Sequence, residues 1–341
     1  MLQIEQSNLL IEDTLNERLF PSEETASAPK LLDRIISDFD FTSYHISTLP
    51  DNNSKLLFSV YLQCWDDLVR FGVAQYLHSK YSAFTPAVTV LSSGEIEPGY
   101  NYSLHVDCEA AVAQGEEFSR SMVAILALLK RNAIASAFEA AFARYDELAQ
   151  QYAGQNTYAE EIQAALQAEP ILVVRHRGDE ESIFIKPSFD RVTVIFSTTF
   201  KDDTDKIFGK VFLQEFVDAR KRSVQTAPQV LFTDKEPPLD IQDVVPRGTV
   251  SENKGYVTFV LFPRHLTKGD RRENCISHIQ FFRNYFHYHI KCAKAYMHSR
   301  MRFRVKEFLK LLNRAKPENL DEDGKDARKT ATGRKFEVSR A

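Results

Sequence analysis

Two groups of polar side chains have residue types that could do chemistry. The first is rich in histidine and cysteine and comprises Cys275, His287, His289, Cys292 and His298. Structural zinc sites take such ligands, usually four of them in paired, closely spaced motifs. On a helix, His287 and His289 point to different sides, and only His289 and Cys292 share a face. We therefore interpret these side chains as helix-surface and interface residues, not as a metal site.

The second group is acidic and comprises Asp179, Glu180, Glu181, Asp202, Asp203 and Asp205. A hydrolase or a divalent-ion site would need such carboxylates to converge. Acids at the start of a helix and in a solvated turn explain the same pattern. The sequence holds no GxxxxGK or GxGxxG phosphate loop and no GxSxG elbow. We therefore expect no catalytic residue, metal or cofactor, and an enzyme using the Asp-rich turn is the least favoured hypothesis.

The longest predicted element is a helix over Arg271–Lys316, which has no Gly or Pro between Gly269 and Pro317. Its apolar residues follow each other mostly at steps of three and four, the spacing of one helical face. Without interruption it would span roughly 70 Å. A domain of this size cannot cover such a helix, so we expect its apolar face to extend onto a partner. The residues expected to pack against the domain and the partner are Ile279, Phe286, Ile290, Met297, Met301, Phe308 and Leu312.

The same helix is strongly basic. It has twelve Lys and Arg residues and two acids, a net charge of +10, whereas the whole chain carries −4. A basic helix on an acidic protein indicates a charged partner surface. Three interpretations stay open from the residues alone. They are a solvated face of an amphipathic helix, a nucleic-acid or anionic-lipid binding helix, and a helix that docks on an acidic protein surface.

The rest of the chain repeats the order strand, strand, helix, strand, long helix. Four dipeptides recur in the same order, namely Phe58-Ser59 and Phe196-Ser197, Asp66-Asp67 and Asp202-Asp203, Phe71-Gly72 and Phe208-Gly209, and Gly99-Tyr100 and Gly255-Tyr256. This repeat predicts an α+β fold of two similar sheet-plus-helix domains from an internal duplication. The expected ranges are a first domain 1–153, a linker 154–170, a second domain 171–269, the helix 270–316 and a polar tail 317–341.

Within these domains we expect one continuous helix over 116–152 and another from Asp66 to about Tyr81. No apolar run is long enough to cross a membrane, and the N-terminus lacks the pattern of a signal peptide. The four cysteines have no paired spacing, which favours reduced thiols. These features predict a soluble intracellular protein.

Several segments closely resemble a known family. They are VTVIFSTTFKDD at 192–203, then GKVFLQEF, TAPQVLF, GYVTFVLFPRH, HYHIKCAKAY and RMR, with YHIS, GYN and LKRN in the first half and TATGRKF near the end. The chain is thereby identified as similar to the subunit 2 family, the 34 kDa class, of the actin-related protein 2/3 complex. The segments 87–97 and 152–168 are longer than the family pattern, and we expect a fungal origin.

The resemblance implies two α/β domains and a long C-terminal helix that pairs with the equivalent helix of subunit 4. It implies a core scaffold that assembles with the other subunits and contacts the side of a mother actin filament to support branched nucleation. ATP would bind the two actin-related subunits instead of this one, and no nucleic acid is expected. The implied location is the cytoplasm and the cytoskeleton, including cortical actin structures. The residues expected to face actin are Lys294, Arg300, Arg302, Arg304, Lys306 and Lys310.

Overall fold

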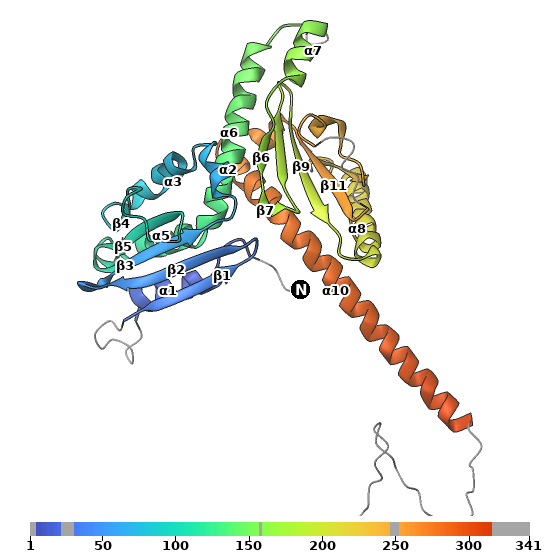
Figure 1. Ribbon diagram of the computed structural model, residues 1–341, viewed down its shortest axis with the longest axis horizontal. Coiled ribbons are helices and arrows are strands. Elements are labelled where there is room, and N and C mark those ends of the chain that lie inside the picture. Colours follow the sequence, from blue (N-terminus) through green and yellow to red (C-terminus); the bar gives the residue numbers. More distant parts are fainter. Residues whose placement is uncertain (1–4, 22–30, 157–158, 246–251, 316–341) are drawn as a thin grey trace, which may run out of the picture. The chain divides into compact units, whose positions relative to one another are not determined.

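The computed structural model describes residues 5–21, 31–156, 159–245 and 252–315 (Figure 1). The chain divides into two compact units between Lys291 and Cys292, within the last helix. The first unit contains two antiparallel five-stranded sheets. The second unit is described separately below.

Sheet A lies in the first half of the chain and has the strand order β1-β2-β3-β5-β4. Its strands are β1 (Asp33–Asp38), β2 (Thr42–Leu49), β3 (Asn52–Tyr61), β4 (Val88–Val90) and β5 (Tyr102–Asp107). Strands β2 and β3 pair with each other as an antiparallel hairpin. Side chains alternate between core and surface along β2, where Tyr44 and Ile46 are buried.

Sheet B lies in the second half and has the order β6-β8-β9-β11-β10 when read from β6. Its strands are β6 (Leu172–Val174), β8 (Ile183–Pro187), β9 (Val192–Thr199), β10 (Gln229–Asp234) and β11 (Lys254–Leu261), and the short β7 (His176–Asp179) lies outside this order. Nearly every residue of the two central strands β9 and β11 is buried. A near-continuous run of β-branched and aromatic residues suits strands that are buried on both faces.

The two sheets follow the same path. With β7 set aside, the first, second, third, fifth and fourth strands of each half lie side by side in that order. In both sheets the third strand pairs antiparallel with the fifth, since Phe58 on β3 pairs with Leu104 on β5, and Phe196 on β9 pairs with Val257 on β11. The predicted α+β class with two similar domains and a long C-terminal helix is confirmed, and the shared strand order supports the duplication.

Helices precede, connect and follow the strands. They are α1 (Leu9–Leu19), α2 (Trp65–Val69), α3 (Val73–Tyr81), α4 (Cys108–Ala113), α5 (Glu116–Ala127), α6 (Leu129–Gln151), α7 (Glu160–Gln167), α8 (Asp203–Arg222), α9 (Pro263–Leu266) and α10 (Asp270–Ala315), with 3-10 turns η1 (Ser82–Phe84) and η2 (Leu239–Ile241). Residue Asn8 caps α1, because its side chain accepts hydrogen bonds from the N–H groups of Leu10 and Ile11. Helix α7 lies inside the segment expected to link the domains.

The prediction of one helix over 116–152 is wrong. The chain ends α5 at Ala127 and begins α6 at Leu129, with a bend of 68° between them. No Gly or Pro causes the break. The carbonyl oxygen of Ala127 accepts from Asn8 N–H at 3.1 Å, and that of Ile125 accepts from the Asn132 side chain at 3.4 Å. Partners from outside α5 satisfy its last carbonyls, so α5 can end without a local stop signal.

A second predicted helix, Asp66 to about Tyr81, is also divided. Gly72 has a left-handed φ of 72° and separates α2 from α3. Glycine adopts this conformation at little cost. The dipeptide Phe71-Gly72 therefore lies at a break, whereas its proposed counterpart Phe208-Gly209 lies inside α8. The edge strands β1 and β10 were not expected as strands.

Helix α6 belongs to the first half by sequence but contacts strands β6, β8 and β9 of sheet B, as Figure 1 shows. One core cluster of buried residues therefore includes side chains from both sheets. Among the described residues, no single helix is long and apolar enough to cross a membrane, although α5 and α6 pass that test as a bent pair. Both helices bury most of their apolar residues in this core.

Candidate partner-binding surface

The first turns of α10 are held to α6 by charged side chains. Arg272 is 6% exposed and donates to Asp146 at 2.9 Å and to the Leu266 carbonyl at 2.9 Å. The Glu273 carboxylate lies 2.7 Å from the Arg131 guanidinium. These contacts leave few buried charges without a partner, which is the condition for burying them at all. They fix the start of α10 in the core.

The middle of the buried part of α10 packs on sheet B. Phe282 contacts Phe196 of β9 and Phe259 of β11, with ring centroids 5.6 and 4.6 Å apart. Gly209 of α8 faces Phe286, since a Cβ built on Gly209 would lie 2.9 Å from the Phe286 ring. A helix can approach an aromatic ring this closely only where it has no side chain.

An ion-pair network joins α10 to the segment before β8. The Glu181 carboxylate receives the Arg283 guanidinium at 2.6 Å, and His287 lies 3.6 Å from its other oxygen. Asp40 lies 3.3 Å from Arg177. Burial raises the pKa of Glu181, but the hydrogen bond from His287 and the charge of Arg283 outweigh it and lower the pKa to about 2. Glu181 is therefore ionised at neutral pH and holds α10 on sheet B.

Most of the described residues of α10 from Cys292 onward are exposed. Met301 and Phe308 have exposed fractions of 59% and 61%, and no described residue buries them. Large apolar side chains at three- and four-residue steps form what we call the apolar row, which consists of Met297, Met301, Val305, Phe308 and Leu312. Apolar surface that is this large and contiguous marks an interaction site.

The apolar row stays on one side of the helix. Met297 and Phe308 are spaced by 11 residues, as are Met301 and Leu312, and an 11-residue repeat corresponds to about 3.67 residues per turn. This value is close to that of a straight α-helix. The row therefore does not wind around α10 as a strict seven-residue repeat would, and a straight partner helix can follow it.

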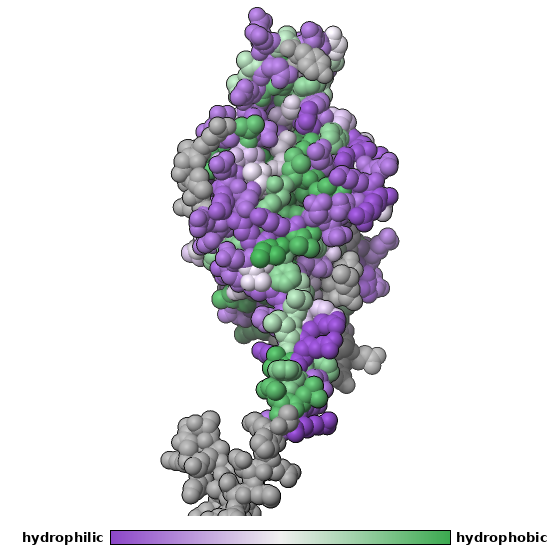
Figure 2. Space-filling model, turned by 90° about the vertical axis from the view of Figure 1, so that its right-hand side faces the viewer, coloured by the Kyte–Doolittle hydropathy of each residue, from purple (hydrophilic) through white to green (hydrophobic). Residues whose placement is uncertain are grey.

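Four basic residues occupy the opposite face. Residues 292–314 contain seven Lys and Arg and one acid, a net charge of +6. Four of them follow at four-residue steps and form what we call the basic row, which consists of Arg302, Lys306, Lys310 and Arg314. Figure 2 shows hydrophobic and hydrophilic residues on opposite sides of this part of the helix. The surface can thus contact an apolar partner on one side and an acidic partner on the other.

The predicted actin-facing residues fall into three sets. Arg302, Lys306 and Lys310 belong to the basic row. Arg300 lies at its flank and donates to the Tyr296 hydroxyl at 2.7 Å, whereas Arg304, four residues before Phe308, lies at the edge of the apolar row. Lys294 is half-buried and shares the face of the apolar row, because it lies three residues before Met297. Sequence reasoning did not include Arg314, although its spacing of four from Lys310 was a usable signal.

The predicted packing residues also divide. Ile279, Phe286 and Ile290 are buried in the core of the first unit, whereas Met297, Met301, Phe308 and Leu312 are exposed. Val305 was omitted from the packing set, and its exposure and spacing place it in the apolar row.

The histidine and cysteine residues do not converge. His287 lies beside Thr198 and Glu181, while His289 stacks on Phe212 at 5.2 Å. Cys292 is exposed and Cys275 is half-buried. In the part of the chain that the structure describes, no group of three or more His, Cys, Asp or Glu side chains could hold a metal ion.

The acidic residues are separated as well. Asp202 caps α8 and accepts from the Asp205 N–H at 2.8 Å, as expected for acids at a helix start. The interpretation of Glu181 as part of a solvated turn is wrong, because it is 2% exposed and ion-paired with Arg283. Its partner lies 102 residues away in sequence, so no local pattern indicated the burial.

Comparison with known proteins identifies the family. The sequence model of the family described as "Arp2/3 complex, 34 kD subunit p34-Arc" matches residues 58–319. The chain belongs to the p34-Arc family. It is 44% identical over 339 residues to actin-related protein 2/3 complex subunit 2 of Schizosaccharomyces pombe, covering 98% of this chain and 99% of that relative. The Dictyostelium discoideum protein of the same name is 33% identical over 336 residues, with 98% and 99% coverage.

The expected family is thus confirmed, and with it an association with the Arp2/3 complex, actin nucleation and the cytoskeleton. Greater identity to the fission yeast relative agrees with the expected fungal origin. Members of the p34-Arc family are structural subunits of a multi-subunit complex. The partners of the apolar and basic rows are a separate question.

Proposed function

We propose that this p34-Arc chain is a non-catalytic core scaffold of an Arp2/3 complex and that α10 is its main assembly surface. The observation that carries the proposal is the exposed apolar row from Met297 to Leu312, which no described residue buries. Five apolar side chains over 16 residues form about four helical turns of contact surface. Association of this face with a partner would remove it from water and is favoured by the hydrophobic effect.

The partner of the apolar row is a helix of subunit 4. A straight row on a straight helix fits another helix, with side chains of each filling gaps on the other. The family resemblance of the HYHIKCAKAY and RMR segments supports subunit 4 as the source of that helix. The paired helices would form the core on which the remaining subunits assemble, including the two actin-related proteins that bind ATP.

Coexpression of this chain with subunit 4 tests the pairing. In the double variant Met301→Asp and Phe308→Asp, two charges would be buried without partners, so copurification of subunit 4 should be lost. Phe303→Asp is the matched control, because Phe303 is 62% exposed but lies on the basic side. All these residues are exposed, so the thermal unfolding of the free chain should not change. Equal copurification with the double variant and the control would refute the pairing.

The basic row faces the acidic side of a mother actin filament. Its charge contrasts with the net charge of −4 of the whole chain, which favours local contact over general attraction to anions. Contacts between exposed charges act mainly on encounter and weaken with salt. Together with the helix pair, this surface would support branched nucleation in the cytoplasm, at cortical actin structures. The alternative is binding of nucleic acid or anionic lipid by the same row, which RNA or acidic vesicles competing with actin would reveal.

A further inference from the structure

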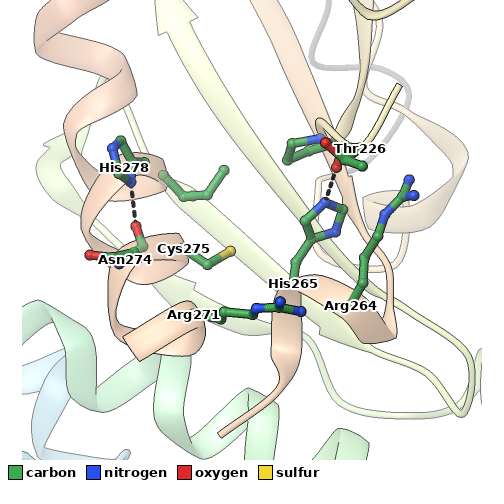
Figure 3. Close-up of a pocket in the computed structure, with 9 residues that line it drawn as sticks. Thr226, Arg264, His265, Arg271, Asn274, Cys275 and His278 are labelled. Atoms are coloured by element: carbon green, nitrogen blue, oxygen red, sulfur yellow. Dashed lines mark hydrogen bonds between the residues drawn. The ribbon is translucent and has the colours of Figure 1, made fainter. Parts of the chain in front are cut away.

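A cavity of about 580 Å³ lies between α9, the start of α10 and the loop before β10. Figure 3 shows Arg271, Asn274, Cys275 and His278 of α10 on one wall, with Thr226, Arg264 and His265 on the other. Pro228 and Ile279 complete the lining. Its volume falls in the range of small-molecule sites, about 300–1,000 Å³. All of it belongs to the first unit of the chain.

The cavity is cationic. None of its nine lining residues is acidic. Within the described ranges, Arg271 forms no ion pair or hydrogen bond. Arg264 pairs with no carboxylate there, since it donates to the Gln225 carbonyl at 3.2 Å and lies over the Phe262 ring. Elsewhere in the described part of this unit, guanidinium groups such as those of Arg131, Arg272 and Arg283 pair with carboxylates. Two guanidinium groups without a carboxylate at one cavity favour an anion.

Other polar groups of the cavity can assist in binding an anion or hold its walls in place. His278 donates its Nδ1 proton to the Asn274 backbone carbonyl at 2.6 Å. The Asn274 side-chain amide, which can donate to an anion, has no hydrogen-bond partner among the described residues. His265 acts as a brace, because its Nδ1 accepts from Phe262 N–H at 3.0 Å and its Nε2 donates to the Thr226 carbonyl at 2.7 Å. This brace fixes the loop wall opposite α10.

The floor of the cavity is apolar. Pro228, Ile279 and the Cys275 thiol supply it, and in Figure 3 the Cys275 sulfur points into the space between the walls. Burial raises the pKa of Cys275 to about 12, so the thiol stays neutral and does not oppose an anion. An apolar floor below cationic walls suits a ligand whose anionic group is attached to a ring or other carbon framework.

We propose that this cavity is a binding site for a phosphate monoester carried on a ring, with Arg264 and Arg271 binding the phosphate. Guanidinium groups match phosphate oxygens with paired N–H donors, which a lysine cannot do. The same chemistry occurs in a soluble inositol phosphate and in a phosphoinositide headgroup of a membrane. The site is distinct from the apolar and basic rows and does not depend on the proposed function.

Calorimetric titration of the full chain with inositol 1,4,5-trisphosphate, and flotation with phosphatidylcholine vesicles with or without phosphatidylinositol 4,5-bisphosphate, test the proposal. Arg264→Ala with Arg271→Ala should weaken binding at least roughly 10- to 100-fold, since each removes hydrogen bonds to a charged group. With Arg264 unchanged, Arg271→Lys should bind more tightly than the double variant but more weakly than the wild type. Arg222→Ala is the matched control, because Arg222 is exposed and lies outside the cavity.

Each outcome has a distinct meaning. Binding of the soluble phosphate that the double variant loses supports a free ligand, and binding only to phosphoinositide vesicles that it loses supports a lipid headgroup. Absence of binding to both probes at millimolar concentration overturns the proposal. Equal binding by the wild type and the double variant overturns it too, and unchanged thermal unfolding of the double variant shows that any loss is local.

Discussion

The Arg283 guanidinium on α10 lies 2.6 Å from the Glu181 carboxylate just before β8, and Glu181 is almost completely buried. His287 and Arg177 add to the same carboxylate from α10 and β7. A buried carboxylate is tolerated only when it has such partners. This network therefore connects the long helix α10 to sheet B.

Glu181→Gln should lower the free energy of unfolding by about 3 kcal/mol, because it removes the nearer carboxylate of Arg283 and leaves that largely buried guanidinium with Asp40, 3.7 Å away, as its remaining counter-charge. Chemical denaturation of the full chain measures this value. Glu180→Gln is the control, since its side chain is exposed one residue earlier and its loss should cost less than about 0.5 kcal/mol. Equal effects of the two substitutions would show that the buried pair does not stabilise the fold.

The same carboxylate should make the fold sensitive to acid. Its pKa is about 2 in the folded chain, below that of an unfolded glutamate near 4.3. As the pH falls, Glu181 is protonated in the unfolded chain before it is protonated in the folded chain. The stabilisation from its ionised carboxylate is therefore present above about pH 4.3 and is lost as the pH falls toward 2. The loss should be roughly 3 kcal/mol in the wild type and absent in Glu181→Gln. Parallel acid titrations of unfolding with no difference between the two proteins would contradict this.

Gly209→Ala should destabilise the packing of α8 against α10. The added methyl would lie 2.9 Å from Phe286 and 3.0 Å from Phe200, and both rings are buried. Overpacking of this kind costs about 1–3 kcal/mol, even though alanine is the better helix former. Gly94→Ala is the control, since nothing lies within 4 Å of its added methyl. A melting temperature of Gly209→Ala equal to that of the control would mean that the helices adjust freely.

The contacts of His45 with two carboxylates, at the surface of sheet A, should make the stability of the fold depend on pH. Its ring contacts Glu97 at 2.6 Å and Asp33 at 2.8 Å. Partial burial lowers the pKa of His45, but these hydrogen bonds outweigh it and the net pKa is raised. Stability from protonated His45 is therefore fully present below the unfolded value, near 6.5, and is lost as the pH rises through the raised folded value.

The matching measurement compares His45→Gln with His78→Gln, whose histidine is exposed on α3. At about pH 6 the His45 variant should be less stable than the control by about 0.5–1 kcal/mol. The difference should shrink at a pH well above the raised folded pKa, where His45 no longer carries its charge. A difference that is the same at both pH values would assign the effect to packing.

Elements whose residues follow a local pattern could be predicted from the sequence. The absence of Gly and Pro over Arg271–Lys316 predicted α10 almost to its ends, and repeated dipeptides predicted two similar domains. The break at Leu128 was not predictable, because groups distant in sequence, such as Asn8, satisfy the last carbonyls of α5. Short edge strands such as β10 lie among prolines and carry little periodicity of their own.

The candidate partner-binding surface could also be predicted only in part from the sequence. Spacing identified the apolar and basic residues of α10, and burial alone then separated Phe286, which packs in the core, from Phe308, which is exposed. Helical geometry also moved Lys294 to the apolar side and added Arg314 to the basic row. The burial of Glu181 required knowledge of Arg283 across the fold, which a single sequence does not contain.

The most direct test is cosedimentation with actin filaments of the assembled complex carrying Ala at Arg302, Lys306, Lys310 and Arg314. The control complex carries Ala at four exposed basic residues elsewhere, Arg70, Arg120, Arg222 and Lys268. At low salt, loss of the basic row should weaken filament binding roughly tenfold or more, while the control binds as the wild type does. Filament binding by the basic-row variant equal to that of the wild type and the control would contradict the assignment of this helix to actin.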